Sequence, residues 1–174
     1  NPVVMLEHKG LYWSKIAGTE EAKTIEPSAD YIIPFGKARI VQEADAAQIK
    51  KGEAAVIVTY GMGVYWAKTA AKSLPGRITI IDLRTLVPMD EETVMGAVRE
   101  HGRCLVVTEE TLTNSFAQAL AGRINDTCFQ QLDAPVRFIG SEDMPAIPLN
   151  STLEATMIPS AEKVGKVLKE LLAY

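Results

Sequence analysis

Three largely apolar runs constrain the fold of this chain more than any other feature: residues 54–60, 77–83 and 103–108. They lack the alternation of a strand with one wet face, so they indicate strands that are buried on both faces of a sheet. Helical spacing of apolar residues follows the first run, over residues 64–74, and the second run, where Asp90 is the expected N-cap and Gly102 the expected end. Strands that alternate with helices predict right-handed crossovers and a mostly parallel sheet.

The remaining segments complete this pattern. We expect strands at residues 38–43 and 136–139, a helix at 115–132 capped by Thr113 or Asn114, and a closing amphipathic helix at 160–173. Residues 142–159 contain proline and show no periodicity, so we expect them to be irregular. The predicted fold is a three-layer α/β/α sandwich whose five-stranded, mostly parallel sheet has residues 38–43 as an antiparallel edge strand.

The first 36 residues differ from the rest. Residues 2–7 are predicted to form a short strand, and the stretch that follows contains Gly10, Gly18, Pro27 and Pro34 without sustained periodicity. A structureless stretch of about 25 residues is uncommon inside a compact domain. We therefore expect residues 1–36 to be the end of a preceding domain plus a linker, and residues 37–174 to be the main domain. The first residue is Asn1, which suggests a processed or excised piece.

Composition narrows the functional classes. The 174 residues are 47% apolar and 23% charged, which is typical of a soluble globular domain, and the net charge of −4 gives no basic footprint for nucleic acid. No apolar run approaches the roughly 20 residues of a bilayer span. Cys104 and Cys128 lack metal-ligand spacing and are predicted to be buried free thiols, which favours a cytoplasmic location, or the mitochondrial matrix in a eukaryote. His8 and His101 lack zinc-ligand spacing, and we expect His101 to be a cation at a helix C-terminus.

Two places could carry chemistry. The turn Tyr60-Gly-Met-Gly63 lies between a strand and a helix, where doubly wound folds bind ligands. The third glycine of a dinucleotide loop would fall at Trp66, so a tight turn is the favoured interpretation and phosphate binding the alternative.

Charged residues also follow two strands, at Asp82 and Arg84 and at Glu109 and Glu110. They are placed either as interface and capping charges, which we favour, or as an acid–base pair in which one carboxyl raises the pKa of the other. No nucleophile or metal-ligand set accompanies them in the sequence.

Several motifs resemble the β subunit of the decarboxylating component of 2-oxo acid dehydrogenase complexes, within the transketolase superfamily. In chain order they are Glu7-His-Lys-Gly-Leu-Tyr12, Ile33-Pro-Phe-Gly-Lys-Ala38, Asp82-Leu-Arg-Thr-Leu-Val-Pro-Met-Asp90, Glu109-Glu-Thr-Leu-Thr113 with Phe116, and Cys128-Phe-Gln-Gln-Leu-Asp-Ala-Pro135. The most specific is the third, whose Asp82, Arg84, Pro88 and Asp90 match the family. Two departures are Thr108, where the family often has histidine before the acid that matches Glu109, and Asn114-Ser115, where it has Gly-Gly.

The resemblance implies a specific role. Such enzymes use thiamine diphosphate and Mg²⁺ to decarboxylate a 2-oxo acid and acylate a lipoyl group, and both the cofactor grip and the activating Glu belong to other domains. Residues 1–36 then correspond to the end of the pyrimidine-binding domain. We expect no catalytic, cofactor-binding or metal-binding residue in this chain, and a structural role for Asp82, Arg84, Pro88, Asp90 and Glu109.

The partners implied are the remaining domains or α subunit of a homodimeric or heterotetrameric parent, and the lipoyl acyltransferase core. Tyr174, with its terminal carboxylate, is a candidate docking residue for a basic partner. Other members of the superfamily, such as transketolase or deoxyxylulose-phosphate synthase, are the nearest alternative. A stand-alone flavodoxin-like module that binds phosphate through the Tyr60–Gly63 turn is the alternative from another class.

Overall fold

A computed structural model describes residues 2, 4, 6–13 and 15–174, and it divides the chain into two units, Asn1–Ile33 and Pro34–Tyr174. The smaller unit holds two 3-10 turns, η1 (Lys9–Leu11) and η2 (Glu20–Ala22). The strand expected at residues 2–7 does not form at residues 2, 4, 6 and 7, while residues 3 and 5 lie outside the described residues.

The larger unit is built on one five-stranded sheet in the order β1-β3-β2-β4-β5. Its strands are β1 (Arg39–Gln42), β2 (Ala55–Thr59), β3 (Ile78–Asp82), β4 (Cys104–Thr111) and β5 (Arg137–Ser141). All neighbours are parallel except β1, which pairs antiparallel with β3 and forms one edge. The predicted sheet and its antiparallel edge strand are therefore confirmed.

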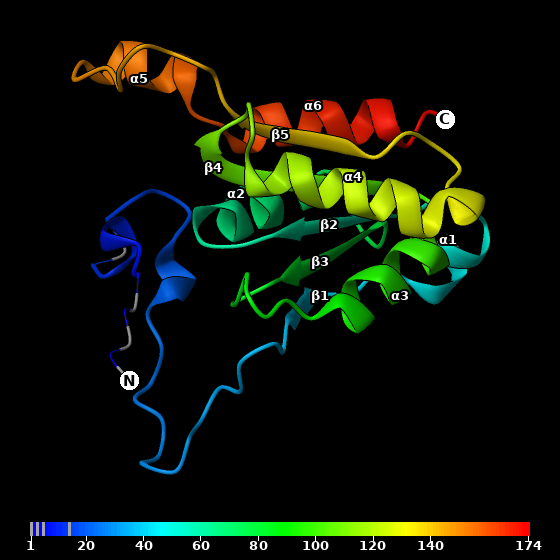
Figure 1. Ribbon diagram of the computed structural model, residues 1–174, viewed down its shortest axis with the longest axis horizontal. Helices are drawn as coiled ribbons and strands as arrows, with labels where there is room; N and C mark the ends of the chain where they lie inside the picture. Colours follow the sequence, from blue (N-terminus) through cyan, green and yellow to red (C-terminus); the bar gives the residue numbers. More distant parts are fainter. Residues whose placement is uncertain (1, 3, 5, 14) are drawn as a thin grey trace. The chain divides into compact units, whose positions relative to one another are not determined.

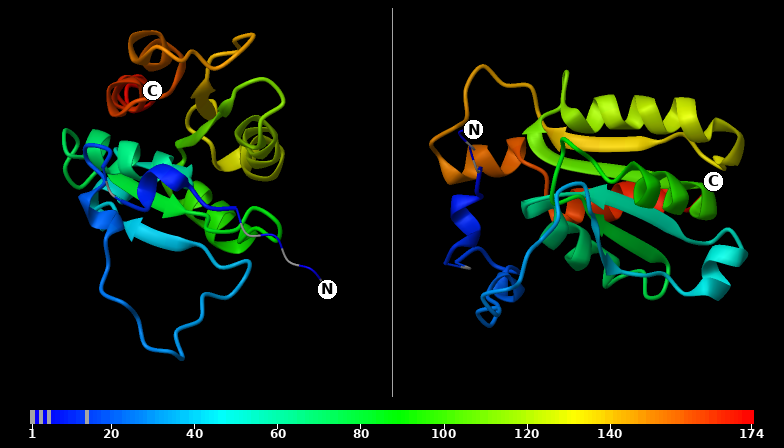
Figure 2. Two further views of the ribbon diagram at one scale, coloured as in Figure 1. Left: turned by 90° about the vertical axis from the view of Figure 1, so that its left-hand side faces the viewer. Right: turned by 60° about the horizontal axis from the view of Figure 1, so that its bottom comes forward.

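Helices cover both faces of the sheet (Figures 1 and 2). Alternate residues of β2 point to opposite layers, because a strand has a side-chain period of two. Ala55 and Ile57 pack in a core with α2 (Met62–Ala71) and α6 (Ala161–Leu171). Val56 and Val58 pack with α3 (Glu91–His101) and α4 (Phe116–Cys128). The three-layer α/β/α sandwich is confirmed.

The helix starts follow from the sequence with one correction. Asp90 caps α3 as predicted, since its side chain accepts a hydrogen bond from the N–H of Thr93. The helix α4 is capped by Ser115, whose hydroxyl accepts from the N–H of Gln118, so the expected cap at Thr113 or Asn114 is wrong. Asn114 has a φ of 60°, whereas an N-cap takes extended backbone angles.

Two short helices were not expected. The helix α1 (Ala46–Lys50) precedes β2, and α5 (Ser151–Met157) lies within the segment predicted to be irregular. Asn150 caps α5, because its side chain accepts from the N–H groups of Thr152 and Leu153. Figure 1 shows α5 lying beyond the strand ends, away from the sheet.

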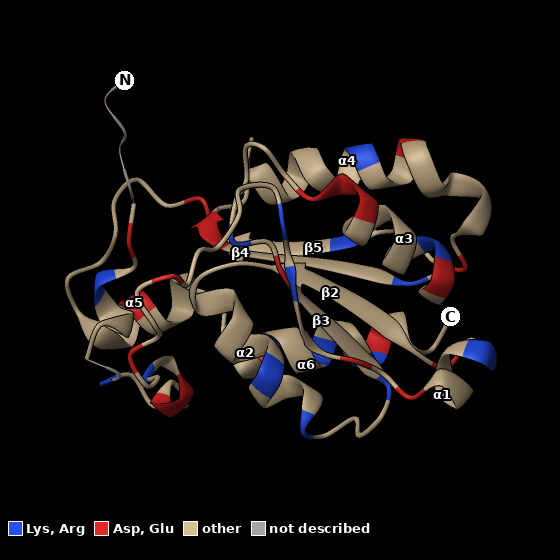
Figure 3. Ribbon diagram, turned by 90° about the horizontal axis from the view of Figure 1, so that it is seen from below, with Lys and Arg blue, Asp and Glu red and all other residues tan. Residues whose placement is uncertain are grey.

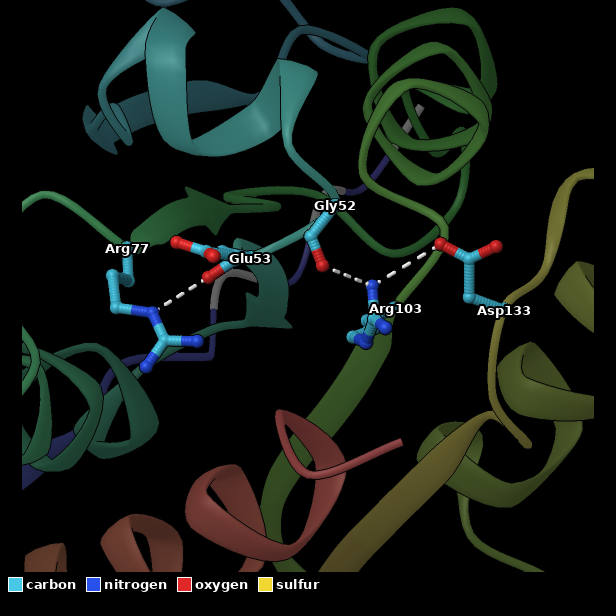
Figure 4. Close-up of polar contacts among 5 residues, drawn as sticks. All are labelled: Gly52, Glu53, Arg77, Arg103 and Asp133. Carbon is cyan, nitrogen blue, oxygen red and sulfur yellow. Dashed lines mark hydrogen bonds and ion pairs between the residues drawn. The ribbon is translucent and has the colours of Figure 1, made fainter.

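The amino ends of the strands are held together by two arginines (Figure 4). Nη1 of Arg103 donates to the carbonyl of Gly52 at 2.5 Å and to Oδ2 of Asp133 at 3.1 Å. Nε of Arg77 donates to the carbonyl of Glu53 at 2.7 Å. These contacts connect the turn before β2 to the starts of β3 and β4. The two arginines therefore have a structural role at the amino ends of these strands.

The environment of His101 corrects the expectation of a cation. Its side chain is buried, with Nδ1 2.7 Å from the carbonyl of Ala97 and Nε2 2.8 Å from the hydroxyl of Thr79. Burial lowers the pKa of His101, against the opposing effects of Ala97 and Glu100. The imidazole is therefore a neutral core group that links α3 to β3.

Cys104 and Cys128 are buried free thiols, as predicted, and burial raises the pKa of Cys104. Within the described residues, no helix has the length and apolarity to cross a membrane. Figure 3 shows basic and acidic residues interspersed along the ribbon of the larger unit.

Candidate functional site

The loop that follows β3 brings the family motif into contact with the entry to the domain. The backbone N–H of Gly36 donates to the hydroxyl of Thr85 at 2.9 Å, and the N–H of Ala38 donates to Oδ2 of Asp90 at 3.0 Å. Gly36 has a φ of 71°, and a Cβ built on it would lie 3.3 Å from Cγ of Pro88. The motif therefore clamps residues 36–38 against the start of α3.

Asp90 is the centre of this clamp. It is only 5% exposed, and besides Ala38 it accepts from the N–H of Thr93 at 3.2 Å and from the Thr93 hydroxyl at 2.9 Å. Burial by itself would raise the pKa of Asp90, but the hydrogen bonds from Ala38 and Thr93 outweigh it, so the pKa is lowered. A carboxylate held ionised by its own domain suits a structural anchor better than a proton donor.

Asp82 stands at the carboxyl end of β3, where it is half-buried. Its Oδ1 accepts from the backbone N–H of Arg84 at 3.1 Å, and Arg84 adopts a left-handed φ of 57°. Burial raises the pKa of Asp82, while Arg84 and Arg39 oppose the rise. The Asp82 carboxylate in turn contributes, after burial, to a raised pKa of Tyr65 on α2. Burial is the largest cause of the raised Asp82 pKa, and neither Glu109 nor Glu110 is among the causes.

A second polar cluster lies at the carboxyl ends of β2 and β4. The Tyr60 hydroxyl donates to Oε1 of Glu110 at 2.9 Å and lies 2.7 Å from the hydroxyl of Thr108. The same Glu110 oxygen accepts from the Thr108 hydroxyl at 3.2 Å and from the N–H of Phe116 at 2.9 Å. The rings of Tyr60 and Phe116 meet edge to face, with centroids 6.0 Å apart.

The surroundings of the Tyr60 hydroxyl in this cluster keep it protonated. Burial is the largest cause that raises the pKa of Tyr60 to about 12; the Thr108 hydrogen bond opposes the rise and Glu110 adds to it. Tyr60 is therefore a neutral hydrogen-bond donor at ordinary pH. Because Glu110 also receives the first N–H of α4, the cluster fixes that helix to the sheet.

The sequence singled out Glu109 of this pair, whereas Glu110 makes these contacts. The backbone carbonyl of Glu109 accepts from the Ser141 hydroxyl at 2.6 Å, which joins β4 to β5. Tyr60 was noted only as part of a turn, and Thr108 only as a departure from the family. A tyrosine and a threonine at the ends of neighbouring strands were the available signal for this cluster.

The glycine turn after β2 allows α2 to pack closely against the sheet. A Cβ at Gly63 would lie 2.0 Å from the hydroxyl oxygen of Thr59, which is buried and donates to the carbonyl of Val107 at 2.9 Å. Gly61 has a φ of 56° and open space around it. The close contact between Gly63 and Thr59 supports the tight turn that we favoured, because a residue without a Cβ lets α2 lie close to the sheet.

Two further points concern ligands and partners. In the described part of the chain, no group of three or more His, Cys, Asp or Glu side chains is placed to hold a metal ion. Tyr174 lies beyond the end of α6, and its residue surface is 64% exposed. At the end of α6, the backbone N–H groups of residues 172 and 173 donate to the carbonyls of residues 168 and 170.

Comparison with known proteins agrees with this architecture. The profile of the family described as the C-terminal domain of transketolase matches residues 44–164. Among solved structures, a split-gene transketolase described as an inactive beta4 tetramer superposes with a TM-score of 0.65 at 19% identity. The match covers 84% of this chain and 45% of that one, and it supports the fold alone.

Curated relatives extend the match across the chain. The β subunit of 2-oxoisovalerate dehydrogenase from Bacillus subtilis is 32% identical over 177 residues, covering 100% of this chain and 50% of the relative. The pyruvate dehydrogenase E1 component subunit β of Rhizobium meliloti is 33% identical over 97% of this chain and 34% of its own length. The β subunit of acetoin:2,6-dichlorophenolindophenol oxidoreductase from Cupriavidus necator is 33% identical over 99% of this chain and 47% of its own length.

This chain thus spans half or less of the length of these three relatives. The region matched by the family profile spans the loop after β3 and the residues of the Tyr60–Glu110 cluster. With a family profile that matches most of its length, the chain belongs to the transketolase C-terminal domain family.

Proposed function

We propose that this chain is the third domain of the β part of a 2-oxo acid dehydrogenase decarboxylating component. Its role is to hold subunits together and to dock the acyltransferase, and it supplies no group to the reaction. Thiamine diphosphate and Mg²⁺ belong to other parts of the parent enzyme, as the family resemblance implies. The chemistry they supply there is decarboxylation of the 2-oxo acid and transfer of the acyl group to a lipoyl arm.

One observation carries this proposal: two carboxylates near the carboxyl ends of the strands, those of Asp90 and Glu110, accept hydrogen bonds from several groups of their own domain. Asp90 accepts three hydrogen bonds from residues 38 and 93, and one oxygen of Glu110 accepts three from residues 60, 108 and 116. A general acid or base must be within hydrogen-bond reach of a substrate proton. Because the Asp90 and Glu110 carboxylates accept hydrogen bonds that fix loops and helix ends, a structural role is favoured over a catalytic one.

The relatives support the parent activity. Their names describe β subunits of dehydrogenases for 2-oxoisovalerate and pyruvate, and they are about two to three times as long as this chain. The part of the relatives beyond this chain is where the family resemblance places the pyrimidine-binding domain. Residues 1–36 are assigned to the end of that domain and its linker, and residues 37–174 to the third domain.

Docking of the acyltransferase is assigned to the carboxyl end. An exposed tyrosine supplies contact area for a partner. Tyr174 lies past the last turn of α6, so a partner can contact it without disturbing the core that Val164, Leu168 and Leu171 form.

Calorimetry on the 174-residue chain tests the absence of a cofactor site. Titration with thiamine diphosphate plus Mg²⁺, and separately with flavin mononucleotide, is expected to give no binding heat. Saturable binding of thiamine diphosphate would contradict the assignment of the cofactor to other domains. Flavin mononucleotide binding with a dissociation constant below about 10 μM, or roughly −7 kcal/mol, would favour the flavodoxin-like alternative.

The variant Arg84→Ala in the parent enzyme tests the role of the loop after β3. Arg84 lowers the pKa of Asp82, against the effect of burial, and adopts a left-handed backbone angle in the loop. Its replacement is therefore expected to lower thermal stability or assembly. Turnover per assembled enzyme is expected to change less than about twofold, since the proposal places the reacting groups in other domains of the parent enzyme. A large loss of turnover in a stable, fully assembled enzyme would contradict the structural role.

A further inference from the structure

We propose that a pocket beside the edge strand β1 receives a lysine or arginine side chain from a partner protein. The pocket has a volume of about 230 Å³ and lies where β1, α1 and α3 meet. We call it the edge pocket. Among its lining residues, we assign Ile40, Ile49 and Ala97 to the walls, Glu43 and Glu100 to the rim, and His101 to the floor. The proposal is independent of the function assigned above.

The floor of the edge pocket carries no charge. His101 and Thr79 are both buried, and their side chains bond to each other. The Thr79 oxygen also accepts from the backbone N–H of Ala44 at 3.0 Å, and the second ring nitrogen of His101 meets the carbonyl of Ala97. A group that enters the pocket therefore finds a satisfied, neutral base and no competing cation.

The walls of the edge pocket are apolar. Ile40 comes from β1, Ile49 from α1 and Ala97 from α3, so three separate elements enclose the space. Ile40 is 46% exposed, which is unusual for a residue whose strand neighbour Ile81 is fully buried. An aliphatic stem that slides between these side chains removes their apolar surface from water.

The rim of the edge pocket is acidic. Glu43 follows directly after β1, and Glu100 lies in the last turn of α3, so two elements place exposed carboxylates at one opening. Within the described residues neither carboxylate forms an ion pair. Glu100 also opposes the lowering of the pKa of His101, which agrees with its position beside the pocket.

An apolar shaft with an acidic opening matches a long basic side chain. Lys and Arg bury their methylene stems along apolar surfaces and keep the charged head in water, where the two rim carboxylates lie. Small-molecule sites usually measure about 300–1,000 Å³, and the edge pocket falls below that range. The size favours one side chain of a larger partner, whose remaining contacts lie along the open edge of β1, since among the described strands β1 pairs only with β3.

Nuclear magnetic resonance titration of the isotope-labelled 174-residue chain tests this proposal. The probe is the peptide acetyl-Ala-Lys-Ala-amide, and its matched control replaces lysine by norleucine, which keeps the stem and removes the ammonium. The lysine peptide is expected to shift the amide signals of Ile40, Ala97 and Glu100, with a dissociation constant on the order of 1–10 mM for so small a ligand. The arginine peptide is expected to bind similarly.

Variants separate the pocket from general attraction to an acidic protein. The pair Glu43→Gln and Glu100→Gln is expected to weaken lysine-peptide binding at least fivefold, whereas the pair Glu92→Gln and Glu162→Gln, with the same change in charge elsewhere, leaves it unchanged. Ala97→Leu fills the shaft and is expected to abolish the shifts; the exposed glutamate pair still decides the matter if that variant folds poorly. Equal binding of the norleucine peptide, equal weakening by both glutamate pairs, or no shift at these residues in 10 mM probe overturns the proposal.

Discussion

Replacing Asp90 by alanine probes the clamp between the loop after β3 and the entry to the domain. The variant loses the N-cap of α3, which is worth about 1 kcal/mol, and leaves the half-buried N–H of Ala38 without its acceptor. An unsatisfied backbone group costs about 1–3 kcal/mol, and partial exposure of Ala38 places it in the lower half of that range. The free energy of unfolding is therefore expected to fall by about 2–3 kcal/mol, which lowers the melting temperature by about 5–10 °C.

Urea denaturation followed by far-ultraviolet circular dichroism measures this change. The matched control is Asp45→Ala, because Asp45 also precedes a helix but makes no side-chain cap hydrogen bond. That control is expected to stay within about 0.5 kcal/mol of the unmodified chain. If Asp90→Ala cost no more than Asp45→Ala, the hydrogen bonds to Asp90 would not hold the domain together, and the structural reading of the motif would be wrong.

The same residue gives a pH signature. The pKa of Asp90 is lowered in the folded chain, so the unfolded chain binds this proton more readily. The stability that Asp90 contributes is complete above its unfolded pKa of about 3.8 and is lost as the pH falls through the lower, folded value. The difference in stability between the unmodified chain and Asp90→Ala is expected to shrink below pH 4; a constant difference would show that the carboxylate charge is not the anchor.

Three further predictions concern other parts of the chain. Because the pKa of His101 is lowered in the folded chain, the free energy of unfolding should fall as the pH drops from about 6.5 towards the folded pKa, by up to about 1.4 kcal/mol per pH unit. The variant His101→Gln should remove this slope in denaturant titrations. An identical slope in the variant would refute a neutral, buried imidazole. Gly63→Ala forces a Cβ onto the Thr59 hydroxyl and should cost about 1–3 kcal/mol, while Gly96→Ala, with open space around it, should stabilise α3 by about 0.5–1 kcal/mol; calorimetric melting curves that rank the two variants the other way would contradict the close approach of α2. Residues 11–28 are expected to be cleaved first in limited proteolysis, because they contain glycine and proline and their described residues form no long helix or strand. Amide exchange there as slow as in β2 would argue against a linker.

The sheet was predictable because its central strands are continuously apolar. A strand buried on both faces leaves a run such as residues 54–60 that a surface strand or loop does not produce. The antiparallel edge followed from position, since residues 38–43 precede the alternating units. The end of β4 was underestimated, because Thr111 pairs with Ser141 only after an irregularity in the ladder, and polar residues 109–111 gave no apolar signal.

The missed elements are short or locally ambiguous. The helix α1 has five residues, too few for a periodic pattern, and α5 lies among prolines and keeps only Met157 buried. Thr113, Asn114 and Ser115 are all good N-caps by residue type, and only their backbone angles separate them. Sequence spacing does not report backbone angles, so the choice required the structure.

The site residues differed in how far sequence could place them. Asp90 was identified as a cap from its position before acidic first-turn residues, but its bond to Ala38 spans 52 positions and has no local signal. His101 was misjudged for the same reason: its local context is a helix end, whereas its partner Thr79 lies on another element. The cluster of Tyr60, Thr108 and Glu110 likewise depends on two neighbouring strands, β2 and β4, meeting in space.

Deletion of Tyr174 in the parent enzyme tests the central claim most directly, with two activities measured side by side. Oxidation of the 2-oxo acid with an artificial dye acceptor reports the chemistry, and calorimetric titration with the subunit-binding domain of the acyltransferase reports docking. We predict that dye-coupled turnover stays within about twofold while docking weakens by about 1–3 kcal/mol, or roughly 5- to 150-fold, from the loss of an exposed aromatic contact. Unchanged docking affinity, or a fall in dye-coupled turnover as large as the fall in docking, would contradict a domain that assembles the complex and leaves catalysis to others.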